Sequence, residues 1–513
     1  MTAAGVPTAI TLPTGVTVSS SRPPRTVVWG GEVITANSTS RPVAVNRSFE
    51  ARVLVPRAPA SPVTLSAVAG GALSGTFSVK PTFGIKDAYG RLLAESGFGP
   101  VATSPALTSQ YLRAANVPIS ADSIPSGCTF FRRLYRTATG PGEVFFPWID
   151  VDGNTVTDVQ NDMSDASIGL VAAPVLGDVP DLSLLAEFRQ RLWGVNRLEI
   201  DTLRFTEADA PWAWSPLNFI PIPRIGQDSR GIVQIASRRE GLGVGRQNSL
   251  HQITGNSLRD FRRQTISEMV GFEGSEAVAV QESTVYFLWK DGVYQWDSSG
   301  VSSLTDKKVR SWFTKDDTFN RSRFQYAKMG INVLRNSLVL QLAAAGSSNE
   351  DRWIEYSFAD GTWWGPHKTD AWTPTCNTWV YDANGQPMWV MGTSDGFVVK
   401  EQATRTDNTA TGIALDVEGK FHDCNTPDIM KFFGELSLIS KIQASGTLSV
   451  LPYVGGLDAS AGSTISASLT TDRQRLRRLG TGRYCKLVFQ NSTAGVDAEL
   501  YGYSVGFHEL GQR

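Results

Sequence analysis

Alternation of apolar and polar residues with a period of two recurs along the chain. Residues 73–83 alternate throughout, and residues 130–136 alternate apolar with basic side chains. Short runs of this kind, bounded by Gly, Asp and Pro, are typical of half-buried β-strands. The best helical stretch, residues 179–193, already passes into a strand-like pattern at Arg191. The pattern therefore predicts an all-β protein.

A repeated unit of roughly 35–50 residues, a length typical of propeller blades, occupies residues 179–409. Each repeat holds two short strands, a tight Gly or Asp turn and an aromatic-rich strand, as in residues 276–304. A four-stranded sheet cannot cover both of its faces alone, so successive sheets are expected to curl into a ring. We therefore predict a β-propeller of five or six blades, which strands in residues 26–60 complete. Gly30 and Gly31 are predicted to form a two-residue hairpin turn between the first two of these strands. The aromatic residues expected in the blade cores are Trp193, Phe205, Trp289, Trp296, Trp353, Trp363 and Trp389.

Three further segments flank the repeats. Residues 1–25 are rich in Gly, Pro, Thr and Ser, which predicts a flexible N-terminal arm that needs a partner to order it. Residues 61–178 are predicted to form an inserted β-sandwich domain, because their alternating runs fit an architecture of about 100 residues. Residues 410–513 are predicted to form a C-terminal β-sandwich.

Composition narrows the classes of function. The chain has 513 residues with a net charge of −1, which argues against a protein that grips nucleic acid or a membrane surface by charge. It contains no apolar run of about 18 residues, so no membrane span is expected, and its start lacks a secretory signal pattern. The four cysteines are scattered. This spacing favours reduced thiols over disulfides or a metal site, and no cofactor is predicted.

The densest basic cluster is the strongest candidate for a binding site. It lies between two strand-like segments of the C-terminal region and consists of Arg473, Arg475, Arg477 and Arg478. We expect it to contact another subunit or a neighbouring protein. Two alternatives stay open: a solvated loop whose charges face water, and a phosphate or nucleic-acid contact. A single cluster on a neutral protein does not make a DNA-binding domain.

Carboxylates suggest weaker candidates. Asp150, Asp152 and Asn154 resemble the start of a calcium loop, but Asn161 stands where the closing Glu is needed, so a hairpin turn is favoured. A glycosidase needs two facing carboxylates. Acids at predicted blade turns could supply such a pair, although Asp is common in turns for conformational reasons. These acids are Glu199, Asp291, Asp297, Asp360 and Asp395.

Other motifs favour structure over catalysis. Residues 357–364 are similar to the Asp-box of sialidase-like propellers, which stabilises a turn. The Gly-rich run at residues 241–245 has no helix signal after it, so a phosphate cradle is not expected there. No motif of a serine, cysteine or zinc enzyme is present. The chain is predicted not to be an enzyme.

Several segments together resemble the tail-nozzle proteins of short-tailed phages, also called tail-tube or head-to-tail stabilisation proteins. These segments are residues 71–100, 132–137, 190–197, 203–212, 285–294 and 482–513. The resemblance implies a virion protein, synthesised in the bacterial cytoplasm, with a propeller and added sandwich domains. It further implies a ring, commonly a hexamer, around the channel through which genomic DNA passes without sequence-specific binding. Its partners would be the adaptor or portal proteins above it and the fibre or tip proteins of the tail.

The near-zero net charge fits a conduit. A channel wall dense in Lys and Arg would hold the DNA by releasing its counterions, so a conduit is expected to be neutral or acidic inside. The low content of charged residues, 19%, fits large permanent interfaces. Rival hypotheses are a propeller that hydrolyses host glycan and a receptor-binding module that retains glycan without turnover.

Overall fold

The computed structural model describes residues 10–18, 23–37, 39–140, 142–155, 158–169, 171–226, 228–306, 309–368, 372–382, 384–401, 415–491, 498 and 500–511. The predicted all-β class is confirmed. Within these residues the only helices are α1 (Arg310–Thr314) and the 3-10 helix η1 (Arg321–Tyr326). The chain divides into two compact units, one of residues 1–367 with 376–389 and one of residues 368–375 with 390–513.

Outside the segment between β4 and β13, small antiparallel sheets follow one another along the first unit, and each strand of a sheet pairs with the next one in sequence. The first sheet contains β1 (Arg25–Trp29), β2 (Glu32–Ala36), β3 (Val43–Val45) and β4 (Ala51–Val53). The second contains β13 (Leu182–Phe188), β14 (Arg191–Asn196), β15 (Thr202–Glu207) and β16 (Ala210–Pro221). The third contains β17 (Gln234–Ser237), β18 (Leu242–Gly245), β19 (Leu250–Thr254) and β20 (Arg262–Ser267).

Two more four-stranded sheets continue the series in the first unit, and a three-stranded sheet follows them in sequence, whose last strand belongs to the second unit. The fourth contains β21 (Val278–Gln281), β22 (Thr284–Trp289), β23 (Gly292–Asp297) and β24 (Gly300–Ser303). The fifth contains β25 (Lys328–Asn332), β26 (Ser337–Leu342), β27 (Arg352–Ser357) and β28 (Trp363–His367). A three-stranded sheet contains β29 (Pro374–Tyr381), β30 (Pro387–Thr393) and β31 (Val398–Lys400).

Tight turns make this local pairing possible. Gly30 and Gly31 join β1 to β2 and have φ angles of 57° and 88°. Positive φ at both central residues is the requirement of the two-residue hairpin turn that matches strand twist, and glycine meets it without steric cost. The hairpin predicted at these two glycines is therefore confirmed.

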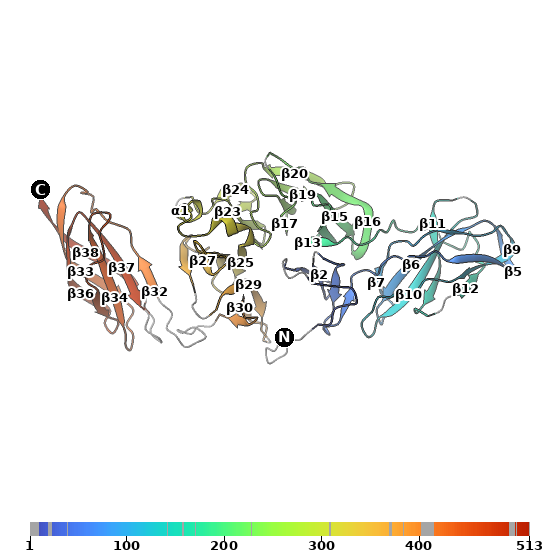
Figure 1. Ribbon diagram of the computed structural model, residues 1–513, viewed down its shortest axis with the longest axis horizontal. Helices are drawn as coiled ribbons and strands as arrows, with labels where there is room; N and C mark the ends of the chain where they lie inside the picture. The colour runs from blue at the N-terminus through green and yellow to red at the C-terminus, as the bar shows by residue number, and fades with distance from the viewer. Residues whose placement is uncertain are drawn as a thin grey trace. The chain divides into compact units, whose positions relative to one another are not determined.

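Consecutive sheets pack face to face through shared hydrophobic clusters. Separate clusters join the first sheet to the second, the second to the third, the third to the fourth and the fourth to the fifth. The first strands of consecutive sheets, β1, β13, β17, β21 and β25, also contact one another in that order. The sheets accordingly follow one another in an arc from β2 through β15 and β19 to β23 and β27 (Figure 1).

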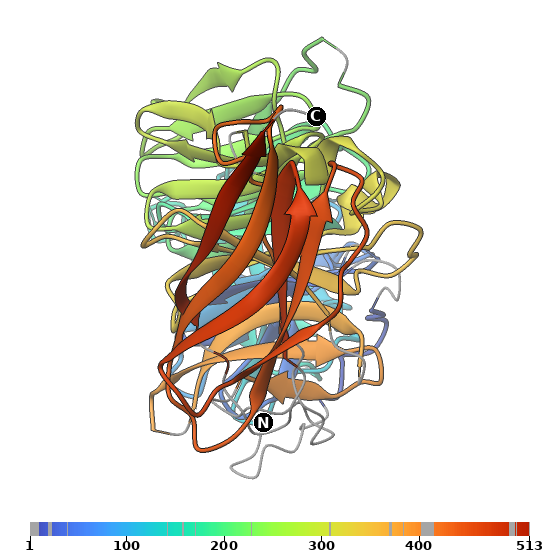
Figure 2. The ribbon, with the colours of Figure 1, turned by 90° about the vertical axis from the view of Figure 1, so that its left-hand side faces the viewer.

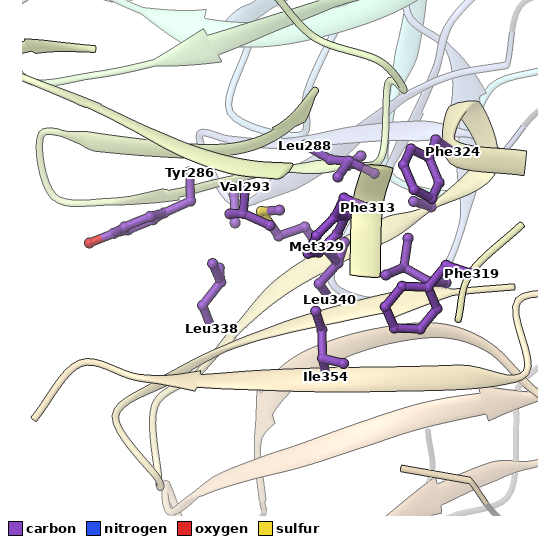
Figure 3. Close-up of a cluster of buried hydrophobic side chains, with 14 of the residues drawn as sticks. Tyr286, Leu288, Val293, Phe313, Phe319, Phe324, Met329, Leu338, Leu340 and Ile354 are labelled. Carbon is purple, nitrogen blue, oxygen red and sulfur yellow. The ribbon is translucent and has the colours of Figure 1, made fainter. Parts of the chain in front are cut away.

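The cluster between the fourth and fifth sheets shows how two faces share one core (Figure 3). Tyr286, Leu288 and Val293 come from the fourth sheet, and strands of the fifth supply the facing aliphatic side chains. Phe313 of α1 and Phe324 of η1 complete this core. The short helical segments therefore cover part of the core that the strands leave open.

The Gly-rich run of β18 allows aromatic rings of the fourth sheet region to approach the backbone. A Cβ on Gly243 would lie 2.8 Å from the ring of Trp296, and a Cβ on Gly245 would overlap the ring of Phe272. Real Cβ atoms do not tolerate such contacts in a close-packed interior. This run is thus explained by packing between sheets.

The segment between β4 and β13 contains two antiparallel sheets. One sheet contains β5 (Thr64–Gly75), β9 (Leu107–Ala115) and β12 (Asp158–Asn161), and the other contains β6 (Ser78–Lys86), β7 (Leu92–Glu95), β8 (Ala102–Thr103), β10 (Thr129–Thr137) and β11 (Phe145–Asp152). The two inner faces share one core that includes Phe77, Leu112, Leu134 and Trp148. Buried Glu95 on β7 accepts hydrogen bonds from Tyr135 (2.6 Å) and Thr82 (2.8 Å), which offset part of its desolvation.

The second unit contains another pair of facing sheets (Figure 2). The four-stranded sheet has the order β32 (Leu415–Glu418), β37 (Tyr484–Asn491), β34 (Thr447–Gly455) and β35 (Ile465–Ser468). The three-stranded sheet has the order β36 (Arg473–Gly482), β33 (Met430–Ser440) and β38 (Leu500–Gly511). Their core includes Phe433, Leu436, Val450 and Phe489.

Part of the segment expected to be a flexible arm packs on the first sheet. Val16 is buried against Val43 and Val53, and Thr39 donates a hydrogen bond to the carbonyl of Thr17 (2.8 Å). The chain itself therefore supplies the contacts that order this stretch. Residues 1–9 and 19–22 of the expected arm lie outside the described residues.

Gly245→Ala is expected to lower the free energy of unfolding by about 1–3 kcal/mol, because the added methyl group must displace the ring of Phe272. Chemical denaturation of the purified chain measures this change. Gly142→Ala is the matched control, since its Cβ would meet only Thr137 at 3.6 Å. Equal stability of the two variants would contradict the packing role assigned to the glycine run.

His251 of β19 is fully buried. Burial, followed by repulsion from Arg263 and Arg246, lowers its pKa to about 4, while Asp228 acts in the opposite direction. The unfolded chain takes up this proton near pH 6.5 and the folded chain only near pH 4, so folding stability falls as the pH drops between these values. The full contribution is about 3 kcal/mol.

His251→Gln should therefore flatten the decline of unfolding free energy between pH 7 and pH 4.5. Equilibrium denaturation at several pH values measures the slope. His508→Gln serves as the control, because His508 is exposed on β38. An unchanged slope in the His251 variant would show that other groups cause the acid sensitivity.

Candidate interaction surfaces

The basic cluster predicted from the sequence lies in a strand. Arg473, Arg475, Arg477 and Arg478 belong to β36, which pairs with β33 and forms one margin of its sheet. The segment is therefore a strand and not a loop, but Arg473 and Arg475 are exposed, as the alternative with solvated charges expects. The side chains of Arg477 and Arg478 lie outside the part of the chain that the structure describes.

The register of β36 places Arg473 and Arg475 on the outer face of this sheet. Leu476 stands opposite Leu436, which is fully buried, so Leu476 faces the core. Its neighbour Arg475 points the other way, because successive side chains of a strand alternate between faces. Arg473 stands opposite Ile439, an exposed residue of β33. Arg473 and Arg475 are both exposed and form a basic row.

Small residues lie beside the basic row. Across β33, Ser437 stands opposite Ser504 of β38, and Ile439 stands opposite Gly502. Arg475 Nε contacts Glu435 Oε1 at 3.4 Å, but its side chain is 78% exposed. Exposed ion pairs contribute little because water competes for both charges. The face therefore offers accessible guanidinium groups, which suit an acidic protein surface.

A groove lies in the first unit. It has a volume of about 360 Å³, and the residues that line it come from β21, β25 and β29 and from the positions directly after β21 and β25. Trp379 and Asn377 of β29 lie on one side, with Gln281 and Glu282 from the β21 end on another. The Trp379 and Tyr381 rings meet edge to face at 4.9 Å. An exposed aromatic side chain beside amide groups is a surface that can bind sugar.

Sequence reasoning missed this groove. Its lining residues are about 100 positions apart between Ala279 and Trp379, so no local motif connects them. β21, β25 and β29 are the first strands of three successive sheets, and they line one groove only because these sheets pack next to each other. The exposed pair Trp379 and Tyr381 was visible in the sequence as an aromatic alternation, but alternation by itself does not distinguish an exposed face from a core face.

The aromatic residues predicted for the blade cores occupy positions in or beside the clusters. Trp193 and Phe205 are fully buried and stack at 4.5 Å between the second and third sheets. Trp296 is buried between the third and fourth sheets. Trp389 is also buried, and its ring lies against Gly330 of β25.

The other predicted aromatic residues are half-buried. Trp289 donates its indole hydrogen to the carbonyl of Gln247 (3.0 Å), and Trp363 donates to that of Leu304 (3.2 Å). Each of these hydrogen bonds crosses from one sheet to the region of its neighbour. Trp353 of β27 contacts the His367 ring at 5.7 Å within its own sheet.

The candidate acids at turns have local partners. Glu199 accepts from Arg204, Asp291 from Tyr294 and Arg310, Asp297 from Ser299, and Asp360 from Thr362. Asp395, at the turn between β30 and β31, accepts from Ser394 (3.3 Å). Asp291 and Asp297 flank β23 from opposite ends, so about 20 Å separates them at 3.3 Å per residue. Glycosidase carboxylates lie within about 10 Å of each other. This pair therefore cannot act together.

The residues that resemble a calcium loop are engaged otherwise. Asp150 accepts hydrogen bonds from Arg133 (2.7 Å) and Lys86 (3.2 Å), and Asn154 pairs with the backbone of Ser120. Burial opposes ionisation of Asp150, but these cationic donors prevail and lower its pKa. Among the described residues, no group of three or more His, Cys, Asp or Glu is placed to hold a metal ion. The four cysteines are free thiols.

No protein-family model matches the chain, and no curated protein matches it significantly. Within the described residues, no helix has the length and apolarity that crossing a membrane requires. The geometry of the surfaces therefore carries the functional argument.

Proposed function

We propose that the chain is a non-enzymatic structural subunit of a tailed-phage virion, a β-propeller with two sandwich domains that forms a ring around the DNA exit channel. The observation that supports this proposal is that the first strands of five four-stranded sheets lie in a series, each in contact with the next. Inner strands of propeller blades are arranged in this way. The location in a virion, the ring and the DNA channel are proposed from the resemblance of several segments to tail-nozzle proteins.

A long-range contact supports a curled series of sheets. Arg25 of β1 donates to Ser275 Oγ (2.6 Å) and contacts Glu276 (3.4 Å), directly before β21. The first and fourth sheets would be about 30 Å apart in a straight stack, at about 10 Å between packed sheets. Their contact favours an arrangement around a common centre. With the three-stranded sheet β29–β31, the proposed propeller has six blades.

The basic row supplies a contact to a neighbouring subunit or tail protein. Forty-nine acidic residues balance forty-eight basic ones, so another copy of the chain also carries enough acidic groups to face this row. Head-to-tail contacts of different surfaces close into rings. The chain is nearly neutral, and its arginines would be used in protein contacts. Passing DNA would then be bound only weakly, which a conduit requires. The adaptor, portal, fibre or tip proteins of the tail are the proposed partners beyond the ring.

Charge reversal tests this assembly. The double variant Arg473→Glu and Arg475→Glu should weaken ring formation by about tenfold or more, since it places carboxylates against an acidic surface. Negative-stain electron microscopy and sedimentation velocity of the full chain measure the fraction in rings. Arg239→Glu is the matched control, because Arg239 is an exposed arginine outside the row.

The wild-type chain and the Arg239 variant are expected to form the same cyclic particles, and mass spectrometry should find the chain in purified virions. A chain that stays monomeric at every concentration and is absent from virions would contradict the proposal. Circular dichroism of the variants confirms that loss of rings does not follow from unfolding.

The groove favours a second candidate function, glycan binding by a receptor-recognition protein of the tail. Its lining residues combine Trp379 with amide side chains but hold a single carboxylate, Glu282. Two-carboxylate hydrolysis is therefore not supported in this groove, whereas sugar retention on an aromatic side chain is.

Trp379→Ala should abolish retention of the chain on immobilised host polysaccharide if this second function holds, because the stacking surface is removed. Glycan-array binding and affinity electrophoresis measure the retention. Trp364→Ala is the control, since Trp364 is exposed but does not line the groove. Identical behaviour of wild type and both variants would exclude the groove as a sugar site.

A further inference from the structure

A pocket in the first unit lies where the end of β16, in the second sheet, meets β20 of the third sheet. It has a volume of about 380 Å³, and its walls come from the start of β15, the end of β16, the segment that follows β16, and β20. The two sheets share one core and lie next to each other in Figure 1. We call this the arginine pocket, because Arg224 and Arg263 line it.

Two arginines share a single carboxylate in the wall of the arginine pocket. Asp201 Oδ2 accepts a hydrogen bond from Arg224 Nε (3.1 Å), and Asp201 Oδ1 accepts one from Arg246 Nη2 (2.7 Å). Arg246 is fully buried beneath the wall and also donates to the carbonyl of Ile222, another lining residue. A buried guanidinium needs a counter-charge, but the carboxylate that provides it here is also the partner of Arg224.

Arg263 contributes a third positive charge. Its Nη1 donates to the carbonyl of Pro221 (3.2 Å), which is a neutral partner, and no acid of the described residues forms an ion pair with it. Burial opposes ionisation of Asp201, but Arg224 and Arg246 prevail and lower its pKa, so its charge is present at neutral pH. Three arginines and one carboxylate therefore leave a surplus of two positive charges.

The other acids of this region are bonded elsewhere. Glu199 accepts two hydrogen bonds from Arg204, at 2.7 Å and 3.0 Å. Asp228 does not line the pocket, and it accepts a hydrogen bond from Ser249 Oγ (2.6 Å). Asp201 is thus the one acid among the described lining residues.

The charge surplus and the accessible donors indicate a phosphate group as the ligand. A phosphomonoester carries a charge of about −1.5 to −2 at neutral pH and three acceptor oxygens, whereas a carboxylate has one charge and two oxygens. Guanidinium groups suit phosphate because their N–H donors bind its oxygens in pairs. The Arg224 side chain is 47% exposed, and Arg263 is exposed as well. Both can therefore reach a ligand from solvent.

The remaining walls indicate what carries the phosphate. Pro221, Ile222 and Pro223 are apolar, and the volume of the pocket exceeds that of one phosphate group. A nucleobase is typically held by stacking on an aromatic side chain, but the lining residues include no aromatic ring. A compact, non-aromatic organic group fits these walls better.

We propose that the arginine pocket binds the phosphate group of a phosphorylated small molecule of the sugar-phosphate class. Arg224 and Arg263 contact the phosphate, Thr202 lines the same wall with its hydroxyl, and Arg246 contributes a buried charge beneath them. The sugar lies against the two prolines. The inference does not rest on the proposed ring or on the groove beside Trp379, because other residues form those surfaces.

Calorimetric titration of the full chain with glucose 6-phosphate tests the proposal. The wild-type chain should bind it with a Kd below about 1 mM. Arg224→Gln and Arg263→Gln should each weaken binding by about tenfold or more, since each removes a charged donor. Arg239→Gln is the matched control, because Arg239 is an exposed arginine outside the pocket, and it should bind like the wild type.

Other probes separate phosphate recognition from general attraction of anions. Inorganic phosphate should bind, glucose should not, and acetate should bind at least about tenfold more weakly than phosphate. Equal affinity for acetate and phosphate, tighter binding of a short DNA duplex than of glucose 6-phosphate, or the same loss in the Arg239 variant would overturn the proposal. So would a wild-type chain that binds no phosphate compound at about 10 mM.

Chemical modification of arginine provides a readout that needs no variant. Glucose 6-phosphate should protect Arg224 and Arg263 from phenylglyoxal and leave the modification of Arg239 unchanged, as measured by peptide mass spectrometry. Modification of the two pocket arginines at the same rate with and without the sugar phosphate would contradict the assignment of the site.

Discussion

A small twisted sheet with apolar side chains on both faces has to be covered on both sides, and this constraint shapes the first unit. No four-stranded sheet there could be stable alone, because each would expose one apolar face to water. Consecutive sheets solve the problem by sharing clusters, so each core belongs to two sheets. The stability of any one sheet therefore depends on its neighbours, as in other repeat architectures.

The same constraint explains the distribution of glycine and tryptophan. Where a ring from the next sheet must approach the backbone, as Trp296 approaches Gly243, the strand has no Cβ. Where a ring reaches the margin of a cluster, its indole nitrogen bonds a carbonyl of the adjoining sheet, as Trp289 bonds Gln247. Packing density and hydrogen-bond satisfaction thus specify the order of the sheets together.

The outer margins of the sheets are not covered by neighbouring sheets, so they are the surfaces available for contacts with other molecules. The basic row lies at one margin of a three-stranded sheet, and the arginine pocket lies where the second and third sheets meet, and each offers a different kind of contact. Charge on the outer face favours an acidic partner, while arginines gathered around one aspartate in a pocket favour a small anion.

Period-two alternation and Gly or Asp turns were sufficient to predict the all-β class and hairpins such as the one at Gly30, because strand formation and turn geometry are local properties of the chain. The basic cluster was also recognisable, but its position in a strand was not, since charge density hides the alternation around Leu476. The groove beside Trp379, the cover over Val16 and the arginine pocket required the folded chain. Each of these features is formed by segments that are distant in sequence. The burial of a residue depends on the neighbours that it meets in the folded chain, and the local sequence pattern does not determine those neighbours.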